Sequence, residues 1–412
     1  MAGVAARTAR SGVRHGGGVG RVVIAACVLV LGFYVASQAL ALAVRQSATD
    51  FSLRLAPRNA LILAQKAESS VANTTSSTRW QNAATTARQA LLRDPLLPSA
   101  ASTLAFGAGL AGDDRLAQQA FTYSQALSRR DLKTHLWAIE YAVARGDVAG
   151  ALRHYNFALL TSRQAPAILF PVLAGAVASQ DVRRALVPLL LKRTEWAPSF
   201  INFVANSSSD HRSAAALFGE LRDRDFIFPT GAEASLLGAL VTNRDYGSAR
   251  SYLDKGVEAD VSKTSRDPHF ASNFATPSPF DWNLQNDVGL TTSIQQGDRG
   301  GIFTFSTVAG AGGPLLRQLQ LLRPGRYEVM SHLTVLHPAD ALPVWAVQCV
   351  DGPELARFAV GAKRAKPSVD GDFTVDATCP AQWLTLAVAP NDSAGGVTGE
   401  LNFAQIRPIG RR

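Results

Sequence analysis

The chain has 412 residues, of which 47% are hydrophobic and 18% are charged, and its formal net charge at pH 7 is +9. This charge does not indicate a nucleic-acid partner. The basic residues cluster near the N-terminus or alternate with acidic residues, as in SRRDLK and ELRDRD, and no basic stripe with interleaved aromatic residues is present.

A long apolar segment lies near the N-terminus. Residues 22–44 contain no charged side chain, and 23 helical residues at about 1.5 Å each can cross a hydrocarbon core of about 30 Å. The preceding tail, residues 1–21, carries only basic charges: Arg7, Arg10, Arg14 and Arg21. We therefore expect a single-pass membrane protein with a cytoplasmic N-terminus and with its bulk on the other side of the membrane.

A cleavable signal peptide is the alternative, because Ala39-Leu40-Ala41 resembles a cleavage site. The apolar run is longer than the usual core of a signal peptide, which favours a retained anchor. Beyond it, Arg45, Arg54 and Arg58 are placed for contact with anionic lipid.

Residues 52–258 contain a repeated pattern. Four alanines are spaced by 34 residues: Ala83, Ala117, Ala151 and Ala185. A slipped copy follows at Ala215, and Ala249 lies 34 residues beyond it. Most of these alanines follow an aspartate by four residues, and the aspartates are Asp113, Asp147, Asp181 and Asp245. Each aspartate is predicted to cap the second helix of a pair, and each alanine to lie where two helices cross closely.

The interval and the A-x3-aromatic spacing at Ala117-Phe121 and Ala151-Tyr155 resemble the tetratricopeptide (TPR) repeat family. This resemblance implies a solenoid of helical hairpins that docks another protein. The alternative is an irregular helical bundle in which the interval is a coincidence.

The pattern changes after the helical region. Residues 259–275 are rich in Ser, Thr, Asn, Asp and Pro, which predicts a linker. Residues 276–412 contain about eight short runs with a period of two, including GIFTFSTV, PVWAVQCV and QWLTLAVAP. The predicted fold is therefore multidomain, with a transmembrane helix, an all-α solenoid and an all-β antiparallel sandwich.

The segment LRPGRYEV, which begins at Leu322, together with PFDWNL and NFAQIRP, resembles jelly-roll domains of the galactose-binding and carbohydrate-binding-module kind. The resemblance implies glycan binding, for which the candidates are Trp282, Trp345 and Trp383. Each lies in a strand-like run, so a place in the core is the competing interpretation. Such modules often hold calcium, but no carboxylates are clustered at calcium-loop spacing here.

Cysteine usage is consistent with export. Cys27 falls in the apolar segment, and the remaining pair, Cys349 and Cys379, is a disulfide candidate. Two unconnected buried thiols are the alternative.

Signatures of catalysis are absent from the sequence, which lacks G-x-S-x-G, H-E-x-x-H, phosphate-loop and dinucleotide-binding patterns. His135 and His154 both fall in the helical region, where they could be neighbours, but no carboxylate or cysteine lies at the ligand spacing of a metal site. We expect no catalytic residue, no metal and no cofactor.

The whole chain resembles membrane-anchored tetratricopeptide proteins of the alphaproteobacterial envelope. That resemblance implies a single-pass protein of a bacterial inner membrane whose periplasmic bulk is a non-catalytic scaffold for polysaccharide assembly. The implied partners are envelope proteins and polysaccharide. The alternative is a carbohydrate-active enzyme whose active site is dispersed in the sandwich.

Overall fold

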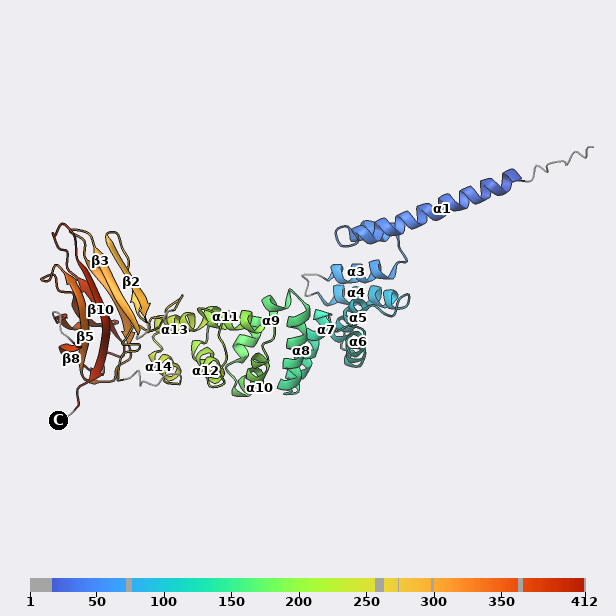
Figure 1. The fold of residues 1–412 in the computed structure, drawn as a ribbon. Helices are drawn as coiled ribbons and strands as arrows, with labels where there is room; N and C mark the ends of the chain where they lie inside the picture. The colour runs from blue at the N-terminus through green and yellow to red at the C-terminus, as the bar shows by residue number, and fades with distance from the viewer. Residues whose placement is uncertain are drawn as a thin grey trace, which may run out of the picture. The chain divides into compact units, whose positions relative to one another are not determined.

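The computed structural model describes residues 17–71, 76–255, 263–272, 274–297, 300–361 and 366–410. In these ranges fourteen helices precede ten strands, which confirms the predicted order of helical and β regions (Figure 1). The chain forms two compact units, Met1–Arg163 and Gln164–Arg412. The predicted basic tail lies outside the described residues, apart from its last few positions.

The first unit contains α1 (Gly17–Val44), α2 (Thr49–Leu55), α3 (Ala60–Ser70), α4 (Ser77–Leu91), α5 (Pro98–Leu110), α6 (Asp114–Leu127), α7 (Leu132–Ala144) and α8 (Val148–Thr161). The second unit begins with α9 (Ala165–Ala176), α10 (Gln180–Leu191), α11 (Ala197–Ser207), α12 (His211–Arg222), α13 (Ala232–Thr242) and α14 (Tyr246–Asp254). Short turns join these helices into successive hairpins, among them α5 with α6 and α7 with α8.

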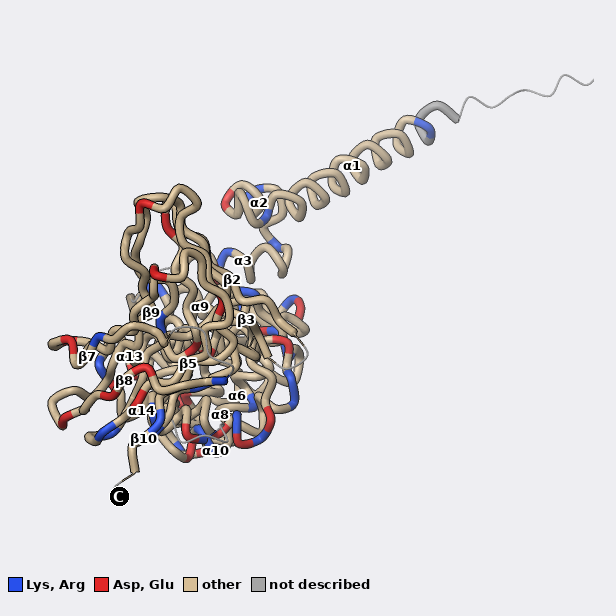
Figure 2. Tube along the Cα trace, turned by 60° about the vertical axis from the view of Figure 1, so that its left-hand side comes forward, with Lys and Arg blue, Asp and Glu red and all other residues tan. Residues whose placement is uncertain are grey.

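Helix α1 is long and apolar enough over Arg21–Val44 to cross a membrane, and this length and composition fit both a membrane span and a signal sequence. Apart from one basic residue near its start, the helix contains no charged residue (Figure 2). Its C-terminal end is packed into the first unit, because Ala41 is fully buried against Ala56 and Ile62. The amide of Asn59 also donates a hydrogen bond of 3.4 Å to the side-chain oxygen of Gln38.

In most of the helical pairs, an aspartate is the N-cap of the second helix. The carboxylates of Asp113, Asp147 and Asp245 accept hydrogen bonds from the third backbone N–H of α6, α8 and α14. Such a cap satisfies an N–H group that has no partner within the helix. Asp131 and Asp210, which the repeat pattern missed, cap α7 and α12 in the same way.

Helix α10 departs from the predicted pattern. Its N-cap is Ser179, so the prediction of a cap at Asp181 is wrong: this residue lies in the first turn. The helix therefore starts two residues early, and Leu186 takes the fully buried position while Ala185 is only partly buried. The other four predicted alanines are buried: Ala83, Ala117, Ala151 and Ala249.

The ten strands form two antiparallel five-stranded sheets. Sheet A has the order β1-β4-β9-β6-β7 and sheet B the order β2-β3-β10-β5-β8. The strands are β1 (Asn283–Leu284), β2 (Leu290–Gly297), β3 (Gly300–Thr307), β4 (Gly313–Gln320), β5 (Gly325–His337), β6 (Val344–Cys349), β7 (Glu354–Ala359), β8 (Ser368–Val375), β9 (Gln382–Val388) and β10 (Thr398–Pro408). The inward faces of both sheets share one apolar core, and the β-sandwich prediction is confirmed.

Two features of the sandwich escaped the sequence pattern. Strand β7 was not predicted because ELARFA, at the edge of sheet A, alternates poorly in hydrophobicity. Part of the predicted linker also packs onto the sandwich. The hydroxyl of Thr264 donates a hydrogen bond of 2.7 Å to the carbonyl of Ile406, and Phe270 is fully buried in the sandwich core. Within the predicted linker, residues 259–262 and 273 lie outside the described residues.

Candidate functional site

The outward face of sheet A is organised around strand β9. Burial alternates along β9, so Leu384 and Leu386 face the core while Trp383 and Thr385 face outward. Paired residues of neighbouring antiparallel strands share a face. Trp383 is therefore flanked by Leu319 of β4 and Gln348 of β6, and Thr385 is flanked by Arg317 of β4 and Ala346 of β6.

The side chains of Arg317 and Trp383 are stacked. The guanidinium carbon of Arg317 lies 3.9 Å from the centroid of the indole ring, a distance typical of a cation–π contact. Across the described residues, no ion pair links Arg317 to a carboxylate. By contrast, Arg357 of the edge strand β7 is held by Glu354 at 2.7 Å. The face thus presents a cation that is positioned by an aromatic ring and that no acidic side chain of the described residues neutralises.

Of the three tryptophans proposed from the sequence, only Trp383 is partly exposed. Trp345 is fully buried between the sheets, and Trp282 is 6% exposed. The indole N–H of Trp282 also donates a hydrogen bond of 2.8 Å to the carbonyl of Asp267. The prediction that Trp282 and Trp345 bind glycan is therefore wrong, because both side chains are buried in the core of the sandwich.

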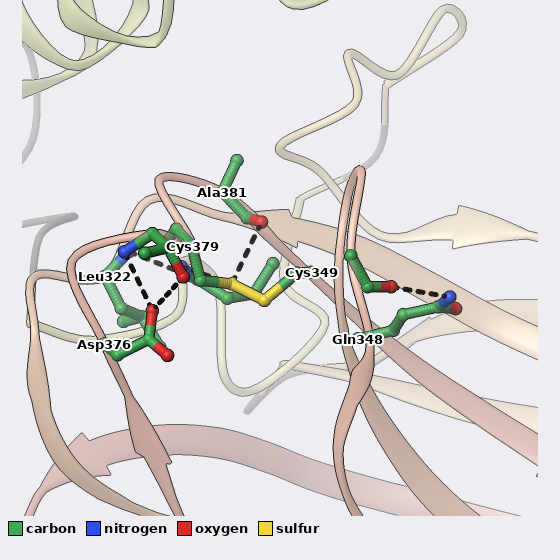
Figure 3. Close-up of a disulfide and its surroundings, with 9 residues drawn as sticks. Leu322, Gln348, Cys349, Asp376, Cys379 and Ala381 are labelled. Atoms are coloured by element: carbon green, nitrogen blue, oxygen red, sulfur yellow. Dashed lines mark hydrogen bonds between the residues drawn. A yellow bond between two sulfur atoms is a disulfide. The ribbon is translucent and has the colours of Figure 1, made fainter.

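Cys349 and Cys379 form a disulfide, as predicted, with their Cα atoms 5.5 Å apart (Figure 3). The bond joins the end of β6 to the connection between β8 and β9. The adjacent Gln382 is buried, and its amide donates a hydrogen bond of 2.6 Å to the carbonyl of Cys379. The disulfide therefore fixes the end of sheet A that carries the β6–β7 turn.

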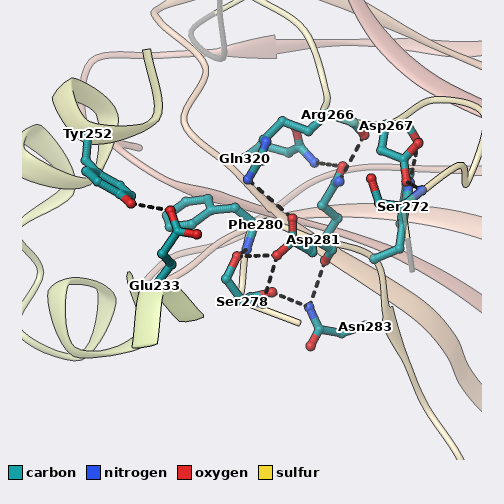
Figure 4. Close-up of polar contacts among 12 residues, drawn as sticks. Glu233, Tyr252, Arg266, Asp267, Ser272, Ser278, Phe280, Asp281, Asn283 and Gln320 are labelled. Atoms are coloured by element: carbon teal, nitrogen blue, oxygen red, sulfur yellow. Dashed lines mark hydrogen bonds and ion pairs between the residues drawn. The ribbon is translucent and has the colours of Figure 1, made fainter. Parts of the chain in front are cut away.

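Polar contacts link the last helices of the second unit to the sandwich. Arg244 forms an ion pair of 3.2 Å with Asp351, and the guanidinium of Arg250 donates a hydrogen bond of 3.0 Å to the carbonyl of Leu321. Figure 4 shows a second group of contacts, in which the hydroxyl of Tyr252 donates to Glu233. Burial, followed by the charge of Glu233, raises the pKa of Tyr252 well above its ordinary value.

In the same view, Arg266 lies beside Asp281 at 3.3 Å, and the hydroxyl of Ser278 donates a hydrogen bond of 2.7 Å to that carboxylate (Figure 4). These contacts tie the segment that follows the helices to the start of sheet A.

His135 and His154 are neighbours in the first unit, with their Nδ1 atoms 3.3 Å apart. The Nε2 of His135 lies 2.8 Å from the carbonyl of Arg129, so Nε2 carries the proton in a neutral His135, and its Nδ1 accepts from His154. Burial, and then the charge of His135, lowers the pKa of His154. Nowhere in the described part of the chain do three or more His, Cys, Asp or Glu side chains gather as metal ligands.

No protein-family model and no curated protein matches the chain. Membership of the tetratricopeptide family therefore stays a prediction. Solved structures with similar folds include carbohydrate-binding modules. TmCBM61 in complex with β-1,4-galactotriose is 14% identical, with a TM-score of 0.22, and the match covers 31% of this chain and 88% of that one.

The CBM22-1 xylan-binding domain of Xyn10C from Paenibacillus barcinonensis is 12% identical, with a TM-score of 0.24 and coverage of 35% and 94%. The arabinose-bound MgGH51 α-L-arabinofuranosidase is 8% identical, with a TM-score of 0.29. Its match covers 37% of this chain and 27% of the enzyme, so this chain spans about a quarter of that protein's length. Scores this low carry no argument about function.

Proposed function

We propose that the protein is a non-catalytic, membrane-anchored scaffold whose sandwich binds an acidic glycan on the outward face of sheet A. The observation that carries this proposal is the guanidinium of Arg317, which is stacked on Trp383 and has no carboxylate partner among the described residues. A guanidinium held in one orientation can form two parallel hydrogen bonds to the carboxylate of a uronic acid. The neighbouring Gln348 and Thr385 supply donors and acceptors for sugar hydroxyls.

Direct binding measurements on the full chain test this proposal. In detergent micelles, the protein should bind polygalacturonate, which carries carboxylates, more tightly than neutral galactan. Arg317→Ala should weaken binding of the acidic polymer about tenfold, the equivalent of about 1.4 kcal/mol. The matched control is Arg326→Ala, because Arg326 lies on sheet B and is 66% exposed. Equal affinity for both polymers, or an unchanged affinity in Arg317→Ala, would refute the proposal.

The competing function is a carbohydrate-active enzyme. Incubation with the same polymers should release no reducing ends if the protein only binds them. Release of reducing ends that scales with protein concentration would contradict the non-catalytic assignment.

The proposed anchor is a retained helix α1 with the bulk of the protein in the periplasm. Burial of Ala41 against Ala56 and Ile62 supports retention, since cleavage after Ala41 would cut through this packed cluster. A reporter that is active only outside the cytoplasm should be active when fused after residue 260. Activity of the same reporter fused ahead of Arg21 would show that the N-terminus lies outside the cytoplasm, which would contradict this topology.

The helical hairpins are proposed to dock an envelope protein involved in polysaccharide assembly. Helices α6 and α7 leave Tyr123, Tyr141 and Val143 exposed, and exposed aromatic residues are common at protein interfaces. A photo-crosslinker at position 141 should capture one defined envelope protein in intact cells, whereas the same group at Val369 on β8 should not. Identical products from both positions would argue against a docking site on these helices.

A further inference from the structure

A cavity of about 500 Å³ lies in the first unit, where α6, the turn after it, α7 and α8 contribute to its wall. Four of the eight lining residues are basic and none is acidic. The basic residues are Arg129, His135, Arg153 and His154. A volume of this size is in the range of small-molecule sites, and a hollow lined by charge of one sign concentrates ions of the opposite sign.

The two arginines of this wall are open to a ligand. Both residues are exposed, and among the described residues neither forms an ion pair with a carboxylate. The guanidinium carbon of Arg129 lies 5.8 Å from the centroid of the Phe157 ring, a cation–π contact that holds this side chain at the cavity. A guanidinium held in this way can form paired hydrogen bonds to an oxyanion.

The aspartates closest to these arginines in the sequence are occupied as helix caps. Asp131 accepts hydrogen bonds from the backbone N–H and the hydroxyl of Thr134, at 3.0 and 2.6 Å. Asp147 accepts a hydrogen bond of 2.8 Å from the N–H of Gly150. Neither aspartate lines the cavity, so the positive charge of the wall is left for a ligand to neutralise.

The histidine pair adds a charge that depends on pH. His154 is only partly buried and lines the cavity, whereas His135 is 1% exposed. The Nδ1 of His154 lies 3.3 Å from the Nδ1 of His135 and 3.4 Å from the amide nitrogen of Gln125. Because His135 accepts from this Nδ1, the proton that His154 gains in acid goes to its Nε2. Protonation therefore adds a third positive charge to the wall.

The surrounding charges oppose this protonation. Burial, and then the positive charges of His135 and Arg153, lower the pKa of His154, and the carboxylate of Asp147 raises it. Arg129, the remaining cation of the wall, has the same sign as Arg153. An anion bound among these cations favours the protonated imidazole, so binding and protonation strengthen each other.

The charge of the wall selects the class of anion. Arg129 and Arg153 carry two positive charges at neutral pH. A carboxylate neutralises one of them, whereas a phosphate ester carries close to two negative charges and three acceptor oxygens, enough for two guanidinium groups.

We propose that this cavity binds the phosphate group of a phosphate ester, with Arg129 and Arg153 in contact with the phosphate oxygens and with stronger binding when His154 is protonated. The site lies on the helices of the first unit and is independent of the glycan-binding face at Arg317.

Titration calorimetry on the full chain, in a non-ionic detergent and at constant ionic strength, tests the proposal. The probes are glycerol 3-phosphate and micelles doped with phosphatidate, which carry the same phosphate group in soluble and in lipid form. At least one probe should bind, and the probe that binds identifies the source of the phosphate. Acetate, with a single charge, should bind at least fivefold more weakly.

The matched variants change one arginine at a time. Arg129→Gln and Arg153→Gln should each weaken phosphate binding at least fivefold. Arg130→Gln should leave it within twofold of the wild type, because Arg130 is exposed in the same turn and does not line the cavity.

Inorganic sulfate separates the titration of the protein from that of the ligand. Sulfate keeps two negative charges from pH 7.5 to pH 5.5, whereas a phosphate ester gains a proton at about pH 6. Sulfate should bind at least threefold more tightly at pH 5.5 than at pH 7.5. His154→Gln should abolish this difference, and His211→Gln, in α12, should retain it.

The proposal is overturned if neither phosphate probe binds, if acetate binds as tightly as phosphate, or if Arg129→Gln and Arg130→Gln have equal effects. It is also overturned if the pH dependence of sulfate binding persists in His154→Gln. Arg317→Ala, which should weaken binding of polygalacturonate, should leave phosphate binding unchanged, so this site and the site on sheet A fail separately.

Discussion

The guanidinium carbon of Arg222 lies 3.9 Å from the centroid of the Tyr252 ring, and both side chains bond to the carboxylate of Glu233. Arg222 lies on α12, Glu233 on α13 and Tyr252 on α14. The guanidinium of Arg222 also donates a hydrogen bond of 3.2 Å to the carbonyl of Tyr252. One charged and aromatic cluster therefore holds the last three helices together.

Removal of the Tyr252 hydroxyl should destabilise this cluster. In Tyr252→Phe the half-buried carboxylate of Glu233 loses one donor but keeps Arg222, and we expect a cost of about 1–2 kcal/mol in unfolding free energy. Tyr123→Phe, at an exposed site, should change it by less than about 0.5 kcal/mol. Chemical denaturation measures both variants. Equal changes in unfolding free energy in the two variants would show that the Tyr252 hydroxyl adds nothing to the stability of the cluster.

Two aspartates offer a matched test of helix capping. Asp147 caps α8 through a hydrogen bond of 2.8 Å from the N–H of Gly150, so Asp147→Ala should cost about 1 kcal/mol. Asp181 lies in the first turn of α10 and is not its cap, so Asp181→Ala should cost less than half as much. Circular dichroism during thermal unfolding compares the two variants. A larger loss in Asp181→Ala would contradict the position of the cap at Ser179.

Close packing at Ala151 is testable within a single helix. Ala151 is 5% exposed, whereas Ala149, two residues earlier in α8, is exposed. Ala151→Leu should overpack the helix contact and destabilise the protein by about 1–3 kcal/mol. Ala149→Leu should stay within about 0.5 kcal/mol of the wild type. If both variants unfold at the denaturant concentration of the wild type, Ala151 does not lie at a tight helix contact.

The disulfide predicts the number of free thiols. The chain has three cysteines, and Cys349 is bonded to Cys379, so the denatured, unreduced protein should titrate one thiol, that of Cys27. Closure of a loop with a sequence separation of 30 stabilises a fold by roughly 3.5 kcal/mol in the chain-entropy model. Reduction should therefore lower the melting temperature of the sandwich. A count of three thiols would exclude the bond.

The histidine pair predicts sensitivity to mild acid. The folded protein lowers the pKa of His154, so folding favours the neutral imidazole. The resulting stability is present above the ordinary histidine pKa and is lost as the pH falls, because protonation then favours the unfolded chain. The melting temperature should fall between pH 7.5 and pH 5, and His154→Gln should reduce that fall. His211→Gln, in α12, is the control. A pH dependence unchanged in His154→Gln would refute this coupling.

Local patterns in the sequence determined much of the helical region. The caps at Asp113 and Asp147 were predictable because a capping side chain bonds to an N–H group only three residues away. The same reasoning failed at Asp181. There Ser179 begins the helix two residues earlier, and Leu186, not Ala185, is the fully buried residue.

The sequence also indicated most of the strands, through their period of two, and a disulfide, through the even pair of cysteines. Only the tertiary structure decided which side of each strand faces the core. Trp345 and Trp383 both lie in alternating strands, yet Trp345 is buried between the sheets and Trp383 faces outward under the guanidinium of Arg317. Alternation specifies two faces without saying which is inward. That choice depends on the position of the second sheet, which packs residues far apart in the chain against one another.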